Sequence, residues 1–153
     1  MTGENLPVTS PVAGRVVPLA EVPDPVFADA MVGPGVAVVP ASGAADAVAP
    51  VDGTIATLHP HAFVVTTDTG RAVLVHLGID TVRLRGEGFT LHAAKGDTVK
   101  AGQPVVGWDP AAVAAAGYAT VCPVIALDAT PEAIADPHEP GPVDIGDRLF
   151  DWH

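Results

Sequence analysis

Three scarcities in this 153-residue sequence exclude whole classes of protein. The only cysteine, Cys122, cannot form a disulfide within the chain, which favours a reducing compartment and predicts a cytoplasmic protein. Seven Lys and Arg oppose 18 Asp and Glu, so the net charge is −11 and there is no basic cluster for nucleic acid or anionic lipid. The N-terminus lacks the basic and apolar regions of a signal peptide, and an uncharged stretch over residues 30–45 is broken by prolines and glycines. We therefore expect neither nucleic-acid binding nor direct membrane insertion.

What the sequence has in abundance indicates an all-β domain with a few short helical turns. Apolar residues make up 48% of the chain, while 16 Gly and 16 Pro are too many for a helical bundle. Segments rich in Val, Ile and Thr recur between Gly, Pro and Asp, as in short strands joined by turns. Residues 1–9 are predicted to be a flexible leader, and residues 10–153 a single domain. The predicted strands are Arg15–Leu19, Val36–Val39, Thr54–Leu58, Ala62–Thr67, Arg71–His76, Val105–Trp108 and Val121–Leu127.

Short helical turns are expected where an Asp or Thr precedes a proline, because such a residue can cap a helix that begins with proline. Asp109-Pro110 opens the clearest of them, which ends at Gly117. Asp24-Pro25 and Thr130-Pro131 open two more, each of one or two turns.

The sequence also contains an internal echo. S-P-V-A-G-R-V at residues 10–16 is matched by A-P-V-D-G-T-I at residues 49–55, and a leucine follows each copy. Two similar turns leading into two similar strands indicate a duplicated β unit, arranged as a pseudo-symmetric antiparallel sandwich or barrel. Chance similarity in a chain rich in Val, Gly and Pro is the alternative.

The histidines are the most informative residues for chemistry. His61 begins one predicted strand, His76 ends the next, and T-D-T-G at residues 67–70 is a tight-turn sequence between them. A two-residue loop would place His61 directly opposite His76, with Cβ atoms about 4.5–5.5 Å apart. A turn that uses Gly70 as a left-handed bulge would instead pair His61 with Leu77 and direct His76 to the other face.

A pair of neutral imidazoles on a β face lined by Phe63, Leu74 and Val26 suits two kinds of chemistry. One imidazole can act as a nucleophile while the other donates an N–H to the group that the first carries, an arrangement fitted to phosphoryl transfer. Alternatively, the two can bind zinc with His59 or Asp80 as a third ligand. Both histidines can also be ordinary half-buried strand residues.

Motifs spread over nearly the whole chain occur in the order of a known family. They are S-P-V-A-G-R-V-V at 10–17, V-P-D-P-V-F-A-D-A-M-V-G-P-G at 22–35, A-P-V-D-G-T-I at 49–55, H-A-F at 61–63, V-H-L-G-I-D-T-V at 75–82, G-E-G-F at 86–89 and K-G-D-T-V-K-A-G-Q at 95–103. In these motifs the chain resembles the glucose-class enzyme IIA of the bacterial phosphoenolpyruvate-dependent sugar phosphotransferase system. Its composition is similar to that of free-standing actinobacterial members, whose sugars include glucose and N-acetylglucosamine. The resemblance implies a β-sandwich of duplicated hybrid units and one enzyme IIA domain over residues 10–153.

The same resemblance implies a phosphoryl relay. The phosphorylated histidine of the family falls on His76, which would accept the phosphoryl group from the phosphocarrier HPr and pass it to a cysteine of a sugar-specific enzyme IIB, free or fused as IIBC. The supporting histidine falls on His61, whose Nε2–H would hold the phosphoryl group, and this favours the register in which both share a face. No cofactor is required, zinc between His61 and His76 is optional and regulatory, and regulatory protein targets are a further expectation.

A docking surface for partner proteins is also implied by the resemblance. Asp24 and Asp80 would supply carboxylates for an arginine of the partner, beside an apolar patch suited to brief docking. The hydroxyl residue often found near the supporting histidine is missing, and we expect His59 in its place. The apolar members of the surface would be Val26, Phe27, Met31, Val32, Phe63, Leu74 and Val82.

Two other functions compete with the relay. Zinc metallopeptidases of the lysostaphin type combine H-x-x-x-D with H-x-H, which this chain offers as His76 with Asp80 and as His59 with His61, although in reversed order. The missing secretion signal opposes this alternative. A biotin or lipoate carrier domain would need a lysine in a setting such as M-K-M, which neither of the two lysines has.

Overall fold

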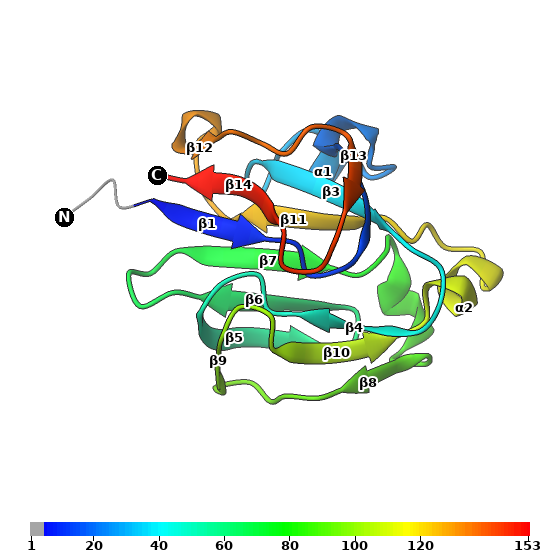
Figure 1. Cartoon of the computed structure of the whole chain (residues 1–153). Helices are drawn as coiled ribbons and strands as arrows, with labels where there is room; N and C mark the ends of the chain where they lie inside the picture. The colour runs from blue at the N-terminus through cyan, green and yellow to red at the C-terminus, as the bar shows by residue number, and fades with distance from the viewer. Residues whose placement is uncertain (1–4) are drawn as a thin grey trace.

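The computed structural model describes residues 5–153, which form layers of antiparallel strands with short helices at their ends (Figure 1). The strands are β1 (Leu6–Thr9), β2 (Gly14–Pro18), β3 (Gly35–Pro40), β4 (Ala45–Val48), β5 (Gly53–His59), β6 (Ala62–Thr66), β7 (Ala72–His76), β8 (Phe89–Leu91), β9 (Thr98–Val99), β10 (Pro104–Trp108), β11 (Cys122–Ala126), β12 (Ile134–Ala135), β13 (Gly141–Val143) and β14 (Arg148–Trp152). The helices are α1 (Pro25–Ala28) and α2 (Pro110–Ala115), with 3-10 turns η1 (Leu19–Glu21), η2 (Thr81–Leu84) and η3 (Pro131–Ala133).

The strands make one large sheet and two small ones. The eight-stranded sheet has the order β13-β2-β3-β11-β7-β6-β5-β9, and the three-stranded sheets are β1-β14-β12 and β4-β10-β8. Side chains from all three sheets share one buried core, which confirms the predicted antiparallel sandwich, whereas the described strands form no closed barrel. Within residues 5–153, no helix is long and apolar enough to cross a membrane.

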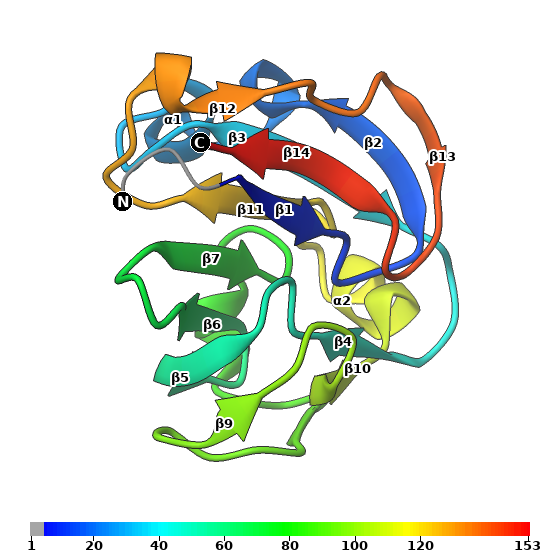
Figure 2. The same ribbon diagram turned by 60° about the vertical axis from the view of Figure 1, so that its left-hand side comes forward.

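The local predictions are largely confirmed. All seven predicted strands are present with small shifts at their ends, and the Asp caps are made: Asp24 Oδ1 accepts the Val26 N–H at 2.9 Å, and Asp109 Oδ1 accepts the Ala111 N–H at 3.0 Å. Thr130 makes no side-chain cap bond, and only the 3-10 turn η3 follows it. Of the predicted flexible leader, residues 1–4 lie outside the described residues, while β1 instead pairs with β14 (Figure 2).

The chain uses one β plan twice. β2 pairs with β3 and β13, as β5 pairs with β6 and β9, and β14 pairs with β1 and β12, as β10 pairs with β4 and β8. The two echoed turns meet through reciprocal bonds, because Thr9 N–H donates to Pro50 O at 3.0 Å and Val48 N–H donates to Pro11 O at 2.9 Å. The duplication indicated by the echo is therefore confirmed. The two repeats join where β7 pairs with β11 (Figure 2).

The large sheet has apolar side chains on both faces. Val73 and Val75 of β7 belong to the main core between the sheets. Leu74, on the other face, packs against a smaller core that contains Phe27 of α1. Because strand side chains alternate between faces, His76 projects on the same side as Leu74, toward α1 and away from the main core.

The β6–β7 hairpin adopts the bulged turn and not the two-residue loop. Its loop comprises residues 68–70, and Gly70 has the left-handed φ of 88° that such a turn requires. Leu77 N–H consequently donates to His61 O at 2.7 Å, so Leu77 lies opposite His61. The register favoured by the resemblance, with His61 opposite His76, is wrong.

Candidate active site

The imidazoles of His61 and His76 lie side by side although their backbones are not directly opposite. Their ring centroids are 5.3 Å apart, and the ring planes meet edge-on at 70°. His76 is the last residue of β7, whereas His61 lies in the turn between β5 and β6. A turn residue is not bound by the alternation of strand side chains, so the His61 ring can reach across to His76. The structure thus brings the two predicted histidines together, although not as directly opposite strand residues.

The hydrogen bond of His76 determines which of its nitrogens carries the proton in the neutral ring. Nδ1 lies 2.5 Å from the carbonyl oxygen of Gly78. A carbonyl only accepts hydrogen bonds, so Nδ1–H donates, and in the neutral ring Nε2 keeps its lone pair. The His76 ring also packs on the Phe27 ring, with centroids 5.2 Å apart. These two contacts orient the ring and leave Nε2 as the nitrogen with the free lone pair.

Gly78 is a site residue that the sequence reasoning missed. Its φ is 80°, and a side chain there would meet the Ala119 carbonyl oxygen at 2.8 Å and the Thr81 Cγ2 at 2.7 Å. The fully buried Thr81 hydroxyl donates to Leu77 O at 2.8 Å, which closes the same turn. The only sequence signal was a glycine two residues after the histidine in V-H-L-G. The tightly packed turn holds the carbonyl that orients His76.

Burial lowers the pKa of both histidines. For His61 the pKa falls to about 4, chiefly through burial and then through the neighbouring positive charges that His76 and His59 can carry. For His76 burial again dominates, while the Gly78 carbonyl, then Asp24, then Asp80 act in the opposite direction. Both imidazoles are therefore neutral at pH 7, as a nucleophile and an N–H donor must be.

The predicted docking surface divides into exposed and supporting residues. Val26, Met31 and Val82 are exposed, at 41%, 69% and 59%, and Val32 and Leu74 are half-buried. Large exposed apolar side chains near a reactive group are typical of the centre of a transient interface.

Two aromatic residues predicted on that surface have other positions. Phe63 is fully buried in the main core, so its predicted docking role is wrong. The cause is the one-residue change in hairpin register, which moves a side chain to the opposite face. Phe27 is only 8% exposed, and its ring packs against the His76 ring instead of being available to a docking partner.

The two predicted carboxylates lie near His76, since both raise its pKa. Asp24 is half-buried, and its Oδ1 caps α1, which leaves the other oxygen for a partner. Asp80 is exposed and adopts a left-handed φ of 62° directly before η2.

The ligand set of the zinc-hydrolase alternative is not assembled. His59 stacks on His61, with centroids 5.6 Å apart and planes at 20°. Nevertheless, among residues 5–153 no three His, Cys, Asp or Glu side chains are grouped so that they could hold a metal ion. Nothing supports this alternative.

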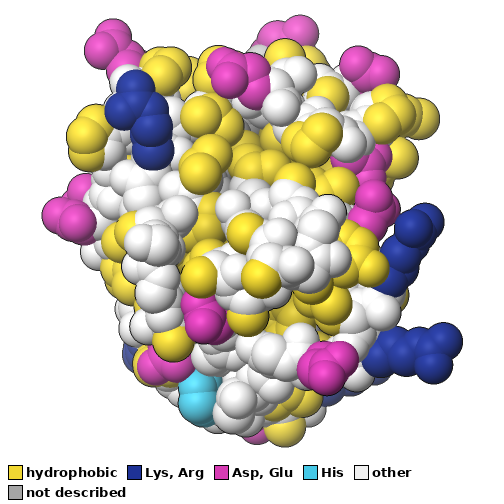
Figure 3. Space-filling model, turned by 90° about the vertical axis from the view of Figure 1, so that its right-hand side faces the viewer, with side chains coloured by type: hydrophobic (Ala, Val, Ile, Leu, Met, Phe, Trp, Pro, Cys, Tyr) yellow, Lys and Arg dark blue, Asp and Glu magenta, His cyan; other side chains and the backbone are white. Residues whose placement is uncertain are grey.

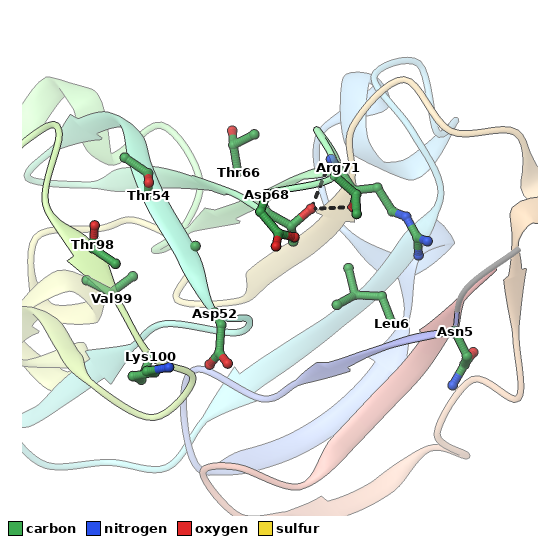
Figure 4. Close-up of a pocket in the computed structure, with 13 residues that line it drawn as sticks. Asn5, Leu6, Asp52, Thr54, Thr66, Asp68, Arg71, Thr98, Val99 and Lys100 are labelled. Carbon is green, nitrogen blue, oxygen red and sulfur yellow. Dashed lines mark hydrogen bonds between the residues drawn. The ribbon is translucent and has the colours of Figure 1, made fainter. Parts of the chain in front are cut away.

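A polar hollow, the face on the α2 side and the single cysteine are the other candidate features. A hollow of about 500 Å³ lies at the opposite end of the β6–β7 hairpin, lined by polar residues that include Thr66, Asp68 and Thr98 (Figure 4). The face on the α2 side shows apolar patches with scattered acidic side chains and basic ones toward its edges (Figure 3). Cys122 is a buried core residue, and burial raises its pKa to about 12, which makes the thiol unreactive.

Comparison with solved structures identifies the class of protein to which this sandwich and its histidine site belong. The structure described as glucose permease IIA from Mycoplasma capricolum matches it with a TM-score of 0.90 and 34% sequence identity. The match covers 99% of this chain and 97% of the other. The fold is thus that of the IIA unit of a sugar permease.

The sequence profile described as "phosphoenolpyruvate-dependent sugar phosphotransferase system, EIIA 1" matches residues 6–131. The chain belongs to this family, as its resemblance implied, and it is a phosphotransferase component. The glucose-specific EIIA component of Oceanobacillus iheyensis is 41% identical over 124 residues, which are 80% of this chain and 74% of the relative.

Two longer relatives contain the same unit. The mannose-specific EIIBCA component of Corynebacterium glutamicum is 40% identical over 129 residues, which cover 83% of this chain and 19% of the relative. The β-glucoside-specific EIIBCA component of Bacillus subtilis is 38% identical over 145 residues, 94% of this chain and 24% of the relative. This chain therefore spans a quarter or less of these two proteins.

Proposed function

We propose that this enzyme IIA carries a phosphoryl group on Nε2 of His76, between phospho-HPr and a cysteine of a sugar-specific enzyme IIB. In the first step the phosphorus–nitrogen bond to the HPr histidine breaks as the bond to Nε2 forms. In the second step that bond breaks as a phosphorus–sulfur bond to the cysteine forms. The hydrogen bond from Nδ1 to the Gly78 carbonyl carries the proposal, because it leaves the Nε2 lone pair free for in-line attack.

His61 stabilises the transferred group in this proposal. Its edge-on ring, 5.3 Å from that of His76, can donate an N–H to a phosphoryl oxygen. In the unphosphorylated protein its pKa is about 4, so the ring is neutral and offers an uncharged N–H donor when the phosphoryl group arrives. In this proposal His61 donates a hydrogen bond to the phosphoryl group, and His76 forms the covalent bond to it.

Glucose-type sugars, including N-acetylglucosamine, are the proposed cargo of the permease that this protein serves. The names of the relatives, specific for glucose, mannose or β-glucosides, support this class. The EIIBCA relatives support an enzyme IIB or IIBC partner, and the exposed Val26, Met31 and Val82 beside Asp24 and Asp80 supply a surface to meet it. We also propose one enzyme IIA domain over residues 10–153 and a cytoplasmic location, which the absence of a disulfide at the single Cys122 supports.

The relay itself needs no cofactor, since both histidines act as neutral imidazoles. The His61 and His76 rings are close enough to share a zinc ion, but the described residues offer no third ligand. The remaining ligands would have to come from a partner protein or from water, so any zinc would belong to a regulatory complex.

Intact-protein mass spectrometry tests the relay. The protein is incubated with phosphoenolpyruvate, enzyme I and HPr and kept alkaline to preserve phosphohistidine. We expect one added phosphoryl group in the wild type and in His61→Ala, and none in His76→Ala. Absence of the added mass in the wild type, with active upstream proteins, would contradict the proposed function.

A further inference from the structure

The turn that carries His61 has a second histidine on the other side of a proline. His59 is the last residue of β5, Pro60 follows it, and His59 pairs with Ala62 at the start of β6. Proline fixes its own φ and confines the preceding residue to extended conformations. The short turn H-P-H therefore restricts the backbone that carries the two imidazoles.

Those two imidazoles are stacked. The centroids of His59 and His61 are 5.6 Å apart and their planes differ by only 20°, a geometry within the range of offset ring stacking. The His61 ring is thus bounded on one side by His59 and meets His76 edge-on at 70° on another. No hydrogen bond to a side-chain nitrogen of His61 is present among the described residues, so these ring contacts are what orient it.

The turn is also supported from outside. A Cβ on Gly86 would lie 3.3 Å from Pro60 Cγ, which places the segment after η2 directly against the proline. His59 itself is exposed, so its ring covers His61 without being locked in the core. A side chain in this position can influence His61 while remaining dispensable for folding.

We propose that His59 is a positioning residue of the phosphoryl relay: its stacked ring holds the His61 imidazole edge-on to His76, with an N–H directed at the phosphoryl group. The inference rests on the proposed role of His61 as a hydrogen-bond donor to the phosphoryl group. His59 touches neither the phosphoryl group nor His76 in this role. It acts through the plane of its ring and not through its charge.

Three variants of the full chain separate the effect of the His59 ring from the effect of its charge. His59→Ala removes both, His59→Phe keeps a stacking ring without a charge, and His92→Ala removes an exposed histidine that pairs with Asp46 elsewhere. Single-turnover transfer from the phosphorylated protein to enzyme IIB is measured for each. Loss of a residue that orients a reactive group typically costs about 10–100-fold, and we expect this for His59→Ala. His59→Phe and His92→Ala should retain the wild-type rate.

Titration of the His61 ring by NMR supplies a second readout. Because a positive charge on His59 contributes to the low pKa of His61, this pKa should rise in both His59→Ala and His59→Phe. Only His59→Ala should also slow phosphoryl transfer to enzyme IIB. Equal transfer rates for His59→Ala and the wild type would overturn the proposal. A transfer rate for His59→Phe as low as that of His59→Ala would also overturn it. Failure of the wild type to accept a phosphoryl group would instead contradict the relay itself.

Discussion

The two repeats of this protein share one hydrogen-bonding plan but differ in the connection between paired strands. In the second repeat, β5 and β6 are joined by Pro60 and His61 alone. In the first repeat, residues 19–34 intervene between β2 and β3 and form η1 and α1. The equivalent strands pair in the same way, so the sheets do not distinguish the repeats. The difference between the repeats lies in these connections.

Both connections contribute to one site where the repeats meet. The short turn of the second repeat supplies His61, and the strand that follows supplies His76. The long connection of the first repeat supplies Phe27, which packs on His76, and the exposed Val26 and Met31. The comparison teaches that duplication built the scaffold, while the two divergent loops supply His61 and Phe27, the rings that contact His76 at the end of β7.

Substitution of the two turn glycines that flank β7 should give the largest difference. Gly78→Ala introduces a Cβ 2.8 Å from the Ala119 carbonyl, which displaces the acceptor of His76 Nδ1 and should slow phosphorylation about 10–100-fold. Gly70→Ala also has a positive φ but meets open space, so it should cost about 1–2 kcal/mol of stability and leave the phosphorylation rate unchanged. Equal phosphorylation rates in the two variants would contradict the assigned role of Gly78.

Removal of the Phe27 side chain, which the first repeat contributes, should lower stability and also change the pKa of His76. Phe27 is buried in the small core, so Phe27→Ala should lower the free energy of unfolding by about 3 kcal/mol in urea denaturation. Loss of the covering ring admits water, so the pKa of His76 should rise toward its ordinary value in an NMR titration. A stable variant with an unchanged His76 titration would show that α1 does not shape the site.

A charge on the exposed patch should affect docking without affecting the fold. Met31 is 69% exposed, so Met31→Asp should raise the KM for phospho-HPr about tenfold, which corresponds to roughly 1.4 kcal/mol of binding, and change stability by less than about 0.5 kcal/mol. Ile145→Asp, at an exposed apolar position outside the proposed surface, is the matched control and should leave KM unchanged. An unaltered KM in Met31→Asp would remove this residue from the docking surface.

The smallest effect should be a dependence of stability on pH. The unfolded chain protonates His61 near pH 6.5, whereas the folded protein resists protonation until about pH 4. The unfolded state therefore binds more protons in this window, and stability should fall as the pH is lowered from about 7 toward 4. Denaturation curves of His61→Ala should show a shallower loss than the wild type. An equal slope in the variant and the wild type would contradict the low pKa of His61.

Sequence patterns predicted the fold better than they predicted the site geometry. The echo at residues 10–16 and 49–55 indicated the duplication, and Asp-Pro pairs located both α-helices, because these signals act over a few neighbouring residues. The sequence left two turn types open for the hairpin, and the register that the family resemblance favoured was wrong and also misplaced Phe63.

Two contacts of the site could not be predicted from sequence spacing. The Gly78 carbonyl reaches His76 because a buried turn packs on Ala119, some 40 residues further along the chain. Stacking of His59 on His61 depends on the rotamers at a two-residue turn. Both are set by tertiary packing, which a linear pattern does not encode.

The nitrogen that carries the phosphoryl group tests the account most directly. The protein is labelled with ¹⁵N at histidine, phosphorylated through HPr, and examined by ³¹P–¹⁵N correlation NMR. Because Nδ1 of His76 donates to the Gly78 carbonyl, we predict coupling of phosphorus to Nε2 of His76, with Nδ1 still protonated. Phosphorus bonded to Nδ1 of His76, or to either nitrogen of His61, would contradict the assignment of Nε2 of His76 as the phosphoryl carrier.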